Sequence, residues 1–240
     1  MKLSGNKILI TGGATGIGLG MAERFAREGN RLILCGRREA VLREAADRIP
    51  EAEYYPCDLV QEEERRKLRD WARKNHPDLT VLINNAGIQQ WMGITDNDFF
   101  ARAKEEIAIN IEAPIHLCHL FADVKSLQTI MNVTSGLSFV PLKKVPVYSA
   151  SKAFFHSFTI SLRAQLKERN IEVIEVIPPA LNTDLGGKGL HDSFPPVDDF
   201  VQSMFTQLAE GRDEITFGFS QIMAQAGPEE LKKAFERMNS

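Results

Sequence analysis

Short apolar runs alternate with longer amphipathic stretches through residue 180 of the chain. The runs have the length and composition of buried strands, and the stretches between them repeat apolar residues at helical spacing. This order predicts a parallel sheet that is covered by helices on both faces and joined by right-handed crossovers. We therefore expect an α/β, doubly wound fold with about seven strands.

The same pattern gives approximate bounds for the elements. The expected strands are Lys7–Thr11, Arg31–Cys35, Ala52–Pro56, Leu79–Asn84, Gln128–Thr134, Glu172–Ile177 and Glu214–Phe217. The expected helices are Gly16–Glu28, Arg38–Arg48, Gln61–Lys74, Asp98–Phe121, Val147–Arg169, Val197–Glu210 and one polar helix at the carboxyl terminus. No linker, repeat or low-complexity tract interrupts the series, so we expect a single domain over residues 1–240.

The composition excludes several classes of protein. A formal net charge of −3 gives no basic surface for nucleic acid. The cysteines Cys35, Cys57 and Cys118 are far apart and lack CxxC spacing, which argues against disulfides and zinc and for a reducing compartment. His116 and His119 lack a third ligand, so no metal site is expected. With no signal-like or membrane-spanning stretch, we expect a cytoplasmic protein.

A glycine-rich turn, TGGATGIG, occupies residues 11–18, where the first strand meets the first helix. Glycines there let the backbone approach a pyrophosphate, while the helix amino terminus supplies N–H donors. The spacing is GxxxGxG, which alone also fits a turn that binds nothing. The candidate cofactor contacts here are Gly12, Thr15, Gly16, Ile17 and Gly18.

Four later segments add to this turn in a fixed order. Asn84–Gly87 (NNAG) follows a strand, Asn110 lies midway along a long helix, Ser135 ends another strand, and Tyr148 and Lys152 open the next helix. Together with the glycine turn, they resemble the short-chain dehydrogenase/reductase family in its shorter, common form. The resemblance implies a Rossmann-type domain, an NAD(P)-dependent oxidoreductase acting on a small molecule, and a homodimer or homotetramer.

Tyr148 and Lys152 are one helical turn apart, so their side chains share a face. A free tyrosine, with a pKa of about 10, is a poor base at neutral pH. An ammonium beside it, with the positive nicotinamide ring, is expected to lower that pKa. Ser135 would orient the substrate oxygen through a hydrogen bond. By the resemblance, Lys152 also binds the nicotinamide ribose, and Asn110 positions a water in a proton relay that ends at Lys152.

The end of the second expected strand predicts the phosphorylated cofactor. Residues 35–38 read CGRR, with no carboxylate to accept a free ribose 2′-hydroxyl. Arg37 can bind a 2′-phosphate bidentately, and Arg38 can add to it. The alternative is that both arginines only begin a solvated helix, and Glu39 stands close by. We expect NADP(H) in preference to NAD(H).

The resemblance implies further cofactor contacts. Asp58 matches the family's aspartate that meets the adenine amine, although it could instead cap a helix. Pro179 stands where the family usually has glycine, which leaves the local backbone conformation open. The remaining candidate contacts are Leu59, Asn85, Ala86, Gly87 and Thr183.

The expected activity is interconversion of a carbonyl and an alcohol on an unidentified, partly apolar molecule. The alternatives are an NADPH-binding sensor or scaffold without turnover, which would not require Tyr148 or Ser135, and epimerisation or dehydration, usually found in longer relatives.

Residues of about 185–200 are expected to form a substrate loop, with Leu190 and Phe194 covering the substrate, or else an ordered loop that does not move. The Pro178-Pro179 variant resembles oxidoreductases described as accessories to D-alanyl teichoic acid synthesis.

Overall fold

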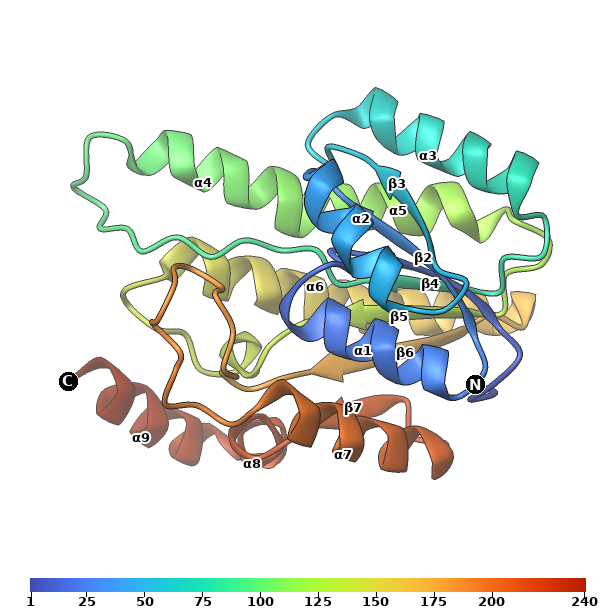
Figure 1. The fold of residues 1–240 in the computed structure, drawn as a ribbon. Helices are drawn as coiled ribbons and strands as arrows, with labels where there is room; N and C mark the ends of the chain where they lie inside the picture. Colours follow the sequence, from blue (N-terminus) through green and yellow to red (C-terminus); the bar gives the residue numbers. More distant parts are fainter.

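A seven-stranded parallel sheet forms the centre of the molecule, in the order β3-β2-β1-β4-β5-β6-β7 (Figure 1). The computed structural model describes residues 1–240. The chain moves outward from β1 to β3 and then returns to place β4 beside β1. This reversal creates a crevice outside the carboxyl ends of β1 and β4, where doubly wound sheets bind ligands. The strands are β1 Lys7–Thr11, β2 Arg31–Gly36, β3 Glu53–Pro56, β4 Val81–Asn84, β5 Thr129–Val133, β6 Glu172–Ile177 and β7 Glu214–Thr216.

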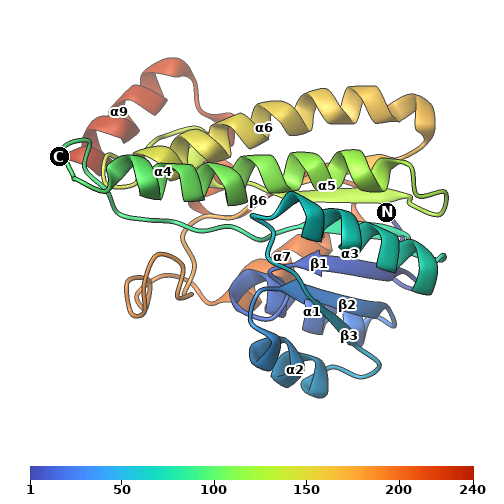
Figure 2. The ribbon, with the colours of Figure 1, turned by 90° about the horizontal axis from the view of Figure 1, so that it is seen from above.

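Helices cover both faces of this sheet (Figure 2). The helices α1, α2 and α7 pack on one face, and α3, α5 and α6 pack on the other. The two apolar cores are of similar size, with 24 and 21 buried residues, which explains why the strands read as continuous apolar runs. The helices are α1 Gly16–Arg27, α2 Glu39–Arg48, α3 Glu62–Asn75, α4 Phe99–Ile107, α5 Ala113–Ala122, α6 Pro146–Leu166, α7 Val197–Ala209, α8 Phe219–Gln225 and α9 Pro228–Asn239.

Alternate residues of each strand point into different cores. In β6, Ile174 and Val176 belong to the core beneath α1 and α7, whereas Val173 belongs to the core beneath α6. Because side chains alternate along a strand, Glu175 points to the same face as Val173. The sheet therefore directs one carboxylate into the layer that α6 covers.

The structure confirms the predicted fold class and element order, with two differences in the helices. The expected helix over residues 98–121 is divided by a π-helical turn, η1, at Ala108–Glu112. The expected single helix at the carboxyl terminus is two helices, α8 and α9, separated by Ala226 and Gly227. Pro228 at the start of α9 explains the second break, since proline fits the first turn of a helix and not its interior.

Candidate active site

The glycine turn brings the amino terminus of α1 close to the end of β1. Gly12 and Gly16 both have positive φ, +64° and +52°, which glycine adopts without strain. A Cβ on Gly18 would lie 2.2 Å from the carbonyl oxygen of Gly12, so no larger residue fits there. Thr15 precedes α1 without capping it through its side chain, and the first turn carries no acidic residue. The turn thus presents helix N–H groups to an anion.

The segment after β4 holds this turn in place. The backbone N–H groups of Asn85 and Ala86 donate to Oγ1 of Thr11, at 3.0 and 3.1 Å. Nδ2 of Asn85 donates to the carbonyl oxygens of Thr11 and Gly12, at 3.0 and 3.2 Å. Two predicted cofactor contacts, Asn85 and Ala86, therefore also brace the turn.

A continuous cleft runs along the carboxyl ends of the central strands. It consists of two adjoining cavities of about 230 and 670 Å³, which share Gly12, Thr15 and Gly87 in their walls. Its size matches that of cofactor sites in proteins. The predicted site residues that line it are Gly12, Thr15, Gly16, Ile17, Arg37, Arg38, Asp58, Leu59, Asn85, Ala86, Gly87, Tyr148, Lys152 and Thr183. Gly18, Asn110 and Ser135 are not among the residues that line it.

The smaller cavity ends at two arginines without ion-pair partners. Arg37 and Arg38 line it, and neither forms a salt bridge within the protein. The neighbouring Glu39 pairs with Arg43 at 3.4 Å, so its carboxylate does not neutralise the two arginines. This end of the cleft can therefore receive a phosphate.

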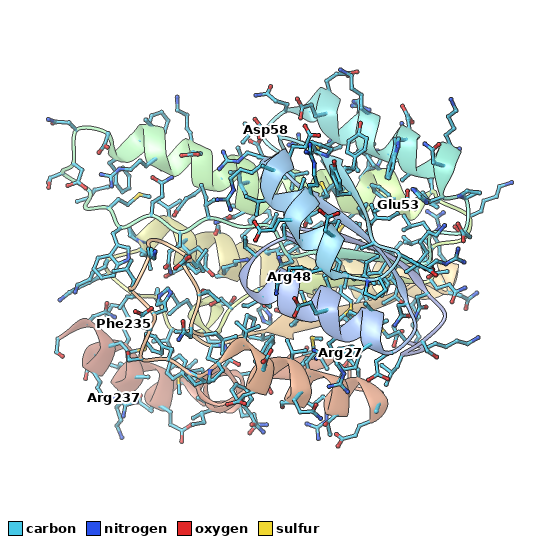
Figure 3. The ribbon with its side chains drawn as sticks, in the orientation of Figure 1. Arg27, Arg48, Glu53, Asp58, Phe235 and Arg237 are labelled. Carbon is cyan, nitrogen blue, oxygen red and sulfur yellow. The ribbon has the colours of Figure 1, made fainter.

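Asp58 lies at the same end of the cleft, near α2 and α3 (Figure 3). Its Oδ1 accepts the backbone N–H of Val60 at 3.2 Å. The cap position of α3 is Gln61, so the alternative assignment of Asp58 as a helix cap is wrong. Asp58 therefore lines the smaller cavity as the predicted cofactor contact requires.

The larger cavity contains Tyr148 and Lys152 from the first turns of α6. Nζ of Lys152 donates to the carbonyl oxygen of Val133, at the end of β5, at 2.8 Å. The same nitrogen lies 5.7 Å from the centre of the Tyr148 ring. Thr183 meets the glycine turn from the other side, because a Cβ on Gly16 would lie 3.4 Å from Cγ2 of Thr183.

Burial dominates the electrostatics of this pair. Burial raises the pKa of Tyr148 to about 12, the Ser135 hydroxyl opposes the rise, and the charge of Glu106 adds to it. Burial lowers the pKa of Lys152 to about 8, against the attraction of Glu175. The expected lowering of the Tyr148 pKa is thus wrong for the protein without its cofactor, in which burial has the largest effect. Burial disfavours the charged form of both groups, which raises the pKa of the phenol and lowers that of the ammonium.

Asn110 occupies the middle of the π-helical turn η1. Its Oδ1 accepts the backbone N–H of Ile88 at 2.9 Å, and its Nδ2 donates to the carbonyl oxygen of Ile88 at 2.8 Å. Gly87 separates it from the cleft, since a Cβ there would lie 3.3 Å from Oδ1 of Asn110 and 3.6 Å from Nζ of Lys152. The Asn110 side chain therefore holds the β4–α4 segment, and isolated π turns of this kind are frequent at functional sites.

Ser135 lies directly after β5, with its hydroxyl beside Tyr148. Its Oγ accepts the backbone N–H of Leu137 at 3.1 Å, which fixes the side chain while leaving the O–H free to donate. The backbone that carries it is tied to β6, because the N–H of Gly136 donates to the carbonyl oxygen of Pro178 at 2.9 Å. Pro179, the residue that replaces a glycine, follows this anchor through a trans peptide bond.

Sequence analysis missed Glu106, one helical turn before Asn110. It is fully buried and accepts the backbone N–H of Gln90 at 2.5 Å, while its Oε2 has no hydrogen-bond partner. Burial raises the pKa of Glu106 to about 7. Its helical position facing Asn110 was the available signal, but a Glu105–Glu106 pair on a polar helix also fits a solvated face.

The raised pKa of Glu106 makes stability depend on pH. The pKa lies above its usual value of 4.5, so the folded protein loses stability as the pH rises from about 4.5 to about 7. We expect Glu106→Gln to melt above the wild type at pH 8 and to lose that advantage towards pH 5. At about 1.4 kcal/mol per pKa unit, the gain in the free energy of unfolding is about 3.5 kcal/mol at most. Calorimetry across this range measures it, with Glu44→Gln, which removes an exposed carboxylate on α2, as the control. A difference in melting temperature that does not vary with pH would contradict the assignment.

The segment over residues 182–196 closes the larger cavity on one side, where the arrowheads of β5 and β6 point (Figure 1). Asn182 ties its two ends together, because its N–H donates to the carbonyl oxygen of Pro195 at 2.9 Å and its Nδ2 donates to that of Asp192 at 3.2 Å. Leu185 and Gly186 line the cavity, and Gly186 lies against Gln89 of the opposite wall.

The two apolar residues that were expected to cover the substrate are not at this wall. Leu190 and Phe194 are 43% and 42% exposed and do not line the cleft. They lie on the part of the loop beyond Gly187, which has a φ of +149°. Only the beginning of the loop therefore faces the cavity.

Outside the cleft, no group of three or more His, Cys, Asp or Glu side chains is arranged to hold a metal. Nδ1 of His116 accepts from Nε of Arg65 at 3.0 Å, and its ring stacks on His119 at 6.4 Å between centres. None of the helices combines the length and apolar character that crossing a bilayer requires.

Comparison with known proteins agrees with this geometry. The family model for short chain dehydrogenases matches residues 6–192. An uncharacterised oxidoreductase of Bacillus subtilis (strain 168), DltE, is 40% identical over 254 aligned residues, which cover 100% of this chain and 99% of the relative. Its name indicates an oxidoreductase and gives no substrate.

Two solved structures have the same fold. A short chain dehydrogenase from Burkholderia cenocepacia J2315 in complex with NADP has a TM-score of 0.87 and 24% identity, with full coverage of both chains. A short chain dehydrogenase/reductase from Burkholderia phymatum in complex with NAD has a TM-score of 0.83 and 19% identity, and covers 100% of this chain and 97% of that one. The two structures hold different nicotinamide cofactors, and at these identities the likeness to this chain shows the shared fold alone.

Proposed function

The chain belongs to the short-chain dehydrogenase family, and on that basis we propose that it is an NADP(H)-dependent oxidoreductase that interconverts a carbonyl and an alcohol on a small, partly apolar molecule. The observation that carries the proposal is the 670 Å³ cavity, in which Tyr148 and Lys152 share one space with the glycine turn. A group that transfers protons thus adjoins a phosphate-binding backbone. The test is substrate-dependent consumption of NADPH.

The donor set of the cleft fits a dinucleotide phosphate. The amino terminus of α1 offers uncapped N–H groups, and Gly18 removes the side chain that would fill the approach to them. Arg37 and Arg38 supply positive charge without an internal partner at the far end. A bound nicotinamide supplies or accepts the hydride that the protein itself cannot provide.

Tyr148 moves the proton that accompanies hydride transfer. In the reducing direction its Oη gives a proton to the substrate oxygen, and in the oxidising direction it takes that proton back. A pKa of about 12 keeps this hydroxyl protonated at neutral pH, so the protein groups prepare it as an acid. Ser135 orients the substrate oxygen through its free O–H, and Lys152 binds the nicotinamide ribose and supplies positive charge beside the phenol.

The beginning of the loop over residues 182–196 forms the substrate side of the site. Leu185 adds apolar surface there, and Gly186 allows the loop to approach Gln89 closely. Closure of this wall on a bound molecule would exclude water from the hydride path.

The assembly we propose is a homodimer or homotetramer. Apolar side chains stand exposed along α4 and α6, among them Phe100 at 70%, Phe154 at 48% and Ile160 at 45%. Such a patch on adjacent helices is typical of a surface that another subunit covers.

We expect a preference for NADPH over NADH, carried by Arg37. In Arg37→Ala, loss of one charge-assisted phosphate contact should cost about 1.5–3 kcal/mol, roughly ten- to hundredfold in NADPH affinity, with little change for NADH. Dissociation constants for both cofactors, measured by fluorescence, check this. The control is Arg48→Ala at the far end of α2, since Arg48 pairs with Glu23 away from the cleft. Equal affinities of the wild type for NADPH and NADH would contradict the assignment.

A further inference from the structure

A buried carboxylate, paired with a half-buried histidine, lies behind the catalytic face of α6. Glu175, in the middle of β6, is completely inaccessible to solvent. Nδ1 of His156 lies 2.9 Å from both of its carboxylate oxygens, and Oγ1 of Thr134 donates to Oε1 at 2.6 Å. A carboxylate on the buried face of a sheet is costly unless it is paired in this way. Sequence analysis and the family resemblance gave none of these three residues a role.

The pair is connected to the active site through two neighbouring elements. On α6, His156 follows Lys152 by one helical turn, as Lys152 follows Tyr148. On the segment after β5, Thr134 stands between Val133, whose carbonyl oxygen accepts from Lys152, and Ser135. One carboxylate thus holds both the helix that carries the tyrosine and lysine and the backbone that carries the serine.

Few other charges surround this carboxylate. From α6, Lys152 feels its charge, and Arg163 acts on its partner His156. Arg163 is already paired with Asp213 and with Glu214, the register neighbour of Glu175 on β7. The segment after β5 contributes the neutral Thr134, and the turn after η2 (Gly136–Ser138) contributes Phe139, whose ring lies 4.9 Å from that of His156. The attraction of Glu175 raises the pKa of Lys152, whereas burial lowers it more strongly. The hydrogen bond to Glu175 raises the pKa of His156.

We propose that Glu175, fixed by His156 and Thr134, is a positioning residue that keeps Lys152 in its ammonium form in the buried site and holds Ser135 in line with Tyr148. It touches neither substrate nor cofactor, and it acts through the charge of Lys152 and the position of Thr134. The inference deepens the proposed function and rests on it for its effect on turnover, whereas its effect on Lys152 does not depend on turnover.

The direction in which the pKa of Lys152 changes when Glu175 is replaced separates this role from a purely structural one. Removing the charge of Glu175 leaves burial unopposed, so Lys152 should lose its proton at a lower pH. A variant that merely loosened the site would admit water and move Lys152 towards its ordinary pKa of 10.5, which is a higher pH. The two accounts therefore predict opposite shifts.

The test is the titration of Lys152 by NMR in the full-length protein with ¹³C-labelled lysine, in which its resonance is assigned by comparison with Lys152→Met. In Glu175→Gln the midpoint should fall by about one pH unit, a tenfold change in the proton dissociation constant. Glu214→Gln, which removes an exposed carboxylate from the adjacent β7, should leave it unchanged. An unchanged or higher midpoint in a folded Glu175→Gln would overturn the proposal.

Two further measurements complete the test. If Glu175→Gln does not fold, the second variant combines Glu175→Met with His156→Leu, because replacing both members of a buried pair with apolar side chains of similar volume often preserves stability. The same fall in midpoint is expected there, and the same contrary results would overturn the proposal.

The alkaline limb of the pH profile of kcat/KM with NADPH should move to lower pH together with the midpoint. A moved midpoint in a protein that reduces no carbonyl would reject the proposed function alone, and an unmoved midpoint in an active enzyme would reject this inference alone.

Discussion

Replacing Tyr148 with phenylalanine is expected to lower kcat by about 10²–10⁴-fold and to leave NADPH affinity within about threefold of the wild type. The substitution deletes only the hydroxyl, so the ring keeps its packing in the cavity wall and the proton donor is lost. No protein group other than Ser135 affects the Tyr148 hydroxyl through a hydrogen bond, so its removal strands few buried partners. Initial rates and fluorescence titrations, measured on the same preparation, separate the two effects.

The matched control is Tyr55→Phe. Tyr55 lies on β3, packed against Trp71 with ring centres 4.7 Å apart and away from the cleft. It should retain wild-type kcat. A Tyr148→Phe variant that kept most of the wild-type activity would show that another group transfers the proton.

Lys152→Ala is expected to lower kcat by a similar factor and, unlike Tyr148→Phe, to weaken NADPH binding by about tenfold or more. The ammonium has two proposed tasks, since it holds the nicotinamide ribose and places positive charge beside Tyr148. Loss of the hydrogen bond that the charged ammonium donates to the ribose accounts for the weaker NADPH binding. Dissociation constants for NADPH and single-turnover rates measure the two tasks separately.

Lys152→Met controls for the space that the alanine leaves. Methionine fills most of the buried volume without the charge. A loss of activity or affinity that both variants share is therefore due to the missing ammonium, and a loss seen only in Lys152→Ala is due to the cavity. Removing a buried charge whose pKa is lowered to about 8 should not destabilise the fold. Normal NADPH affinity in both variants would exclude Lys152 from cofactor binding.

The sequence predicted the fold because local and global signals agree in this chain. Apolar runs such as Leu9 and Ile10 of β1 lie in sealed cores on both faces of the sheet, as the uninterrupted pattern required. The glycine turn and the TyrxxxLys spacing are local, so the residues that line the cleft around Gly12 and Tyr148 could be identified without the structure.

The features that the sequence did not predict depend on contacts between distant segments. Glu175 is one of two glutamates within EVIEVI, and only the register of β6 shows that it faces α6 rather than solvent. The pairing of Glu175 with His156 joins residues 19 positions apart. The π-helical turn at Asn110 shifts the spacing of apolar residues along the helix too little to be recognised in a single sequence.

The direction of the Tyr148 pKa shift was also beyond sequence reasoning. Proximity of Lys152 suggested a lowered value, but the cost of burying a phenolate depends on the whole surrounding wall. Glu106, which helps to raise that pKa, lies on a different helix, α4, where its place in a Glu105–Glu106 pair also fits a solvated face.

The measurement that tests the central claim most directly is the stoichiometry of carbonyl reduction. Wild-type protein and NADPH are incubated with a panel of aldehydes and ketones, including partly apolar ones, and NADPH loss and alcohol formation are followed together, beside NADPH binding by fluorescence. We expect at least one carbonyl to yield one alcohol per NADPH consumed, with no alcohol from Tyr148→Phe. Tight NADPH binding with no alcohol from any carbonyl, and no NADP⁺ reduction with the corresponding alcohols, would contradict the assignment as an enzyme and favour a sensor or scaffold.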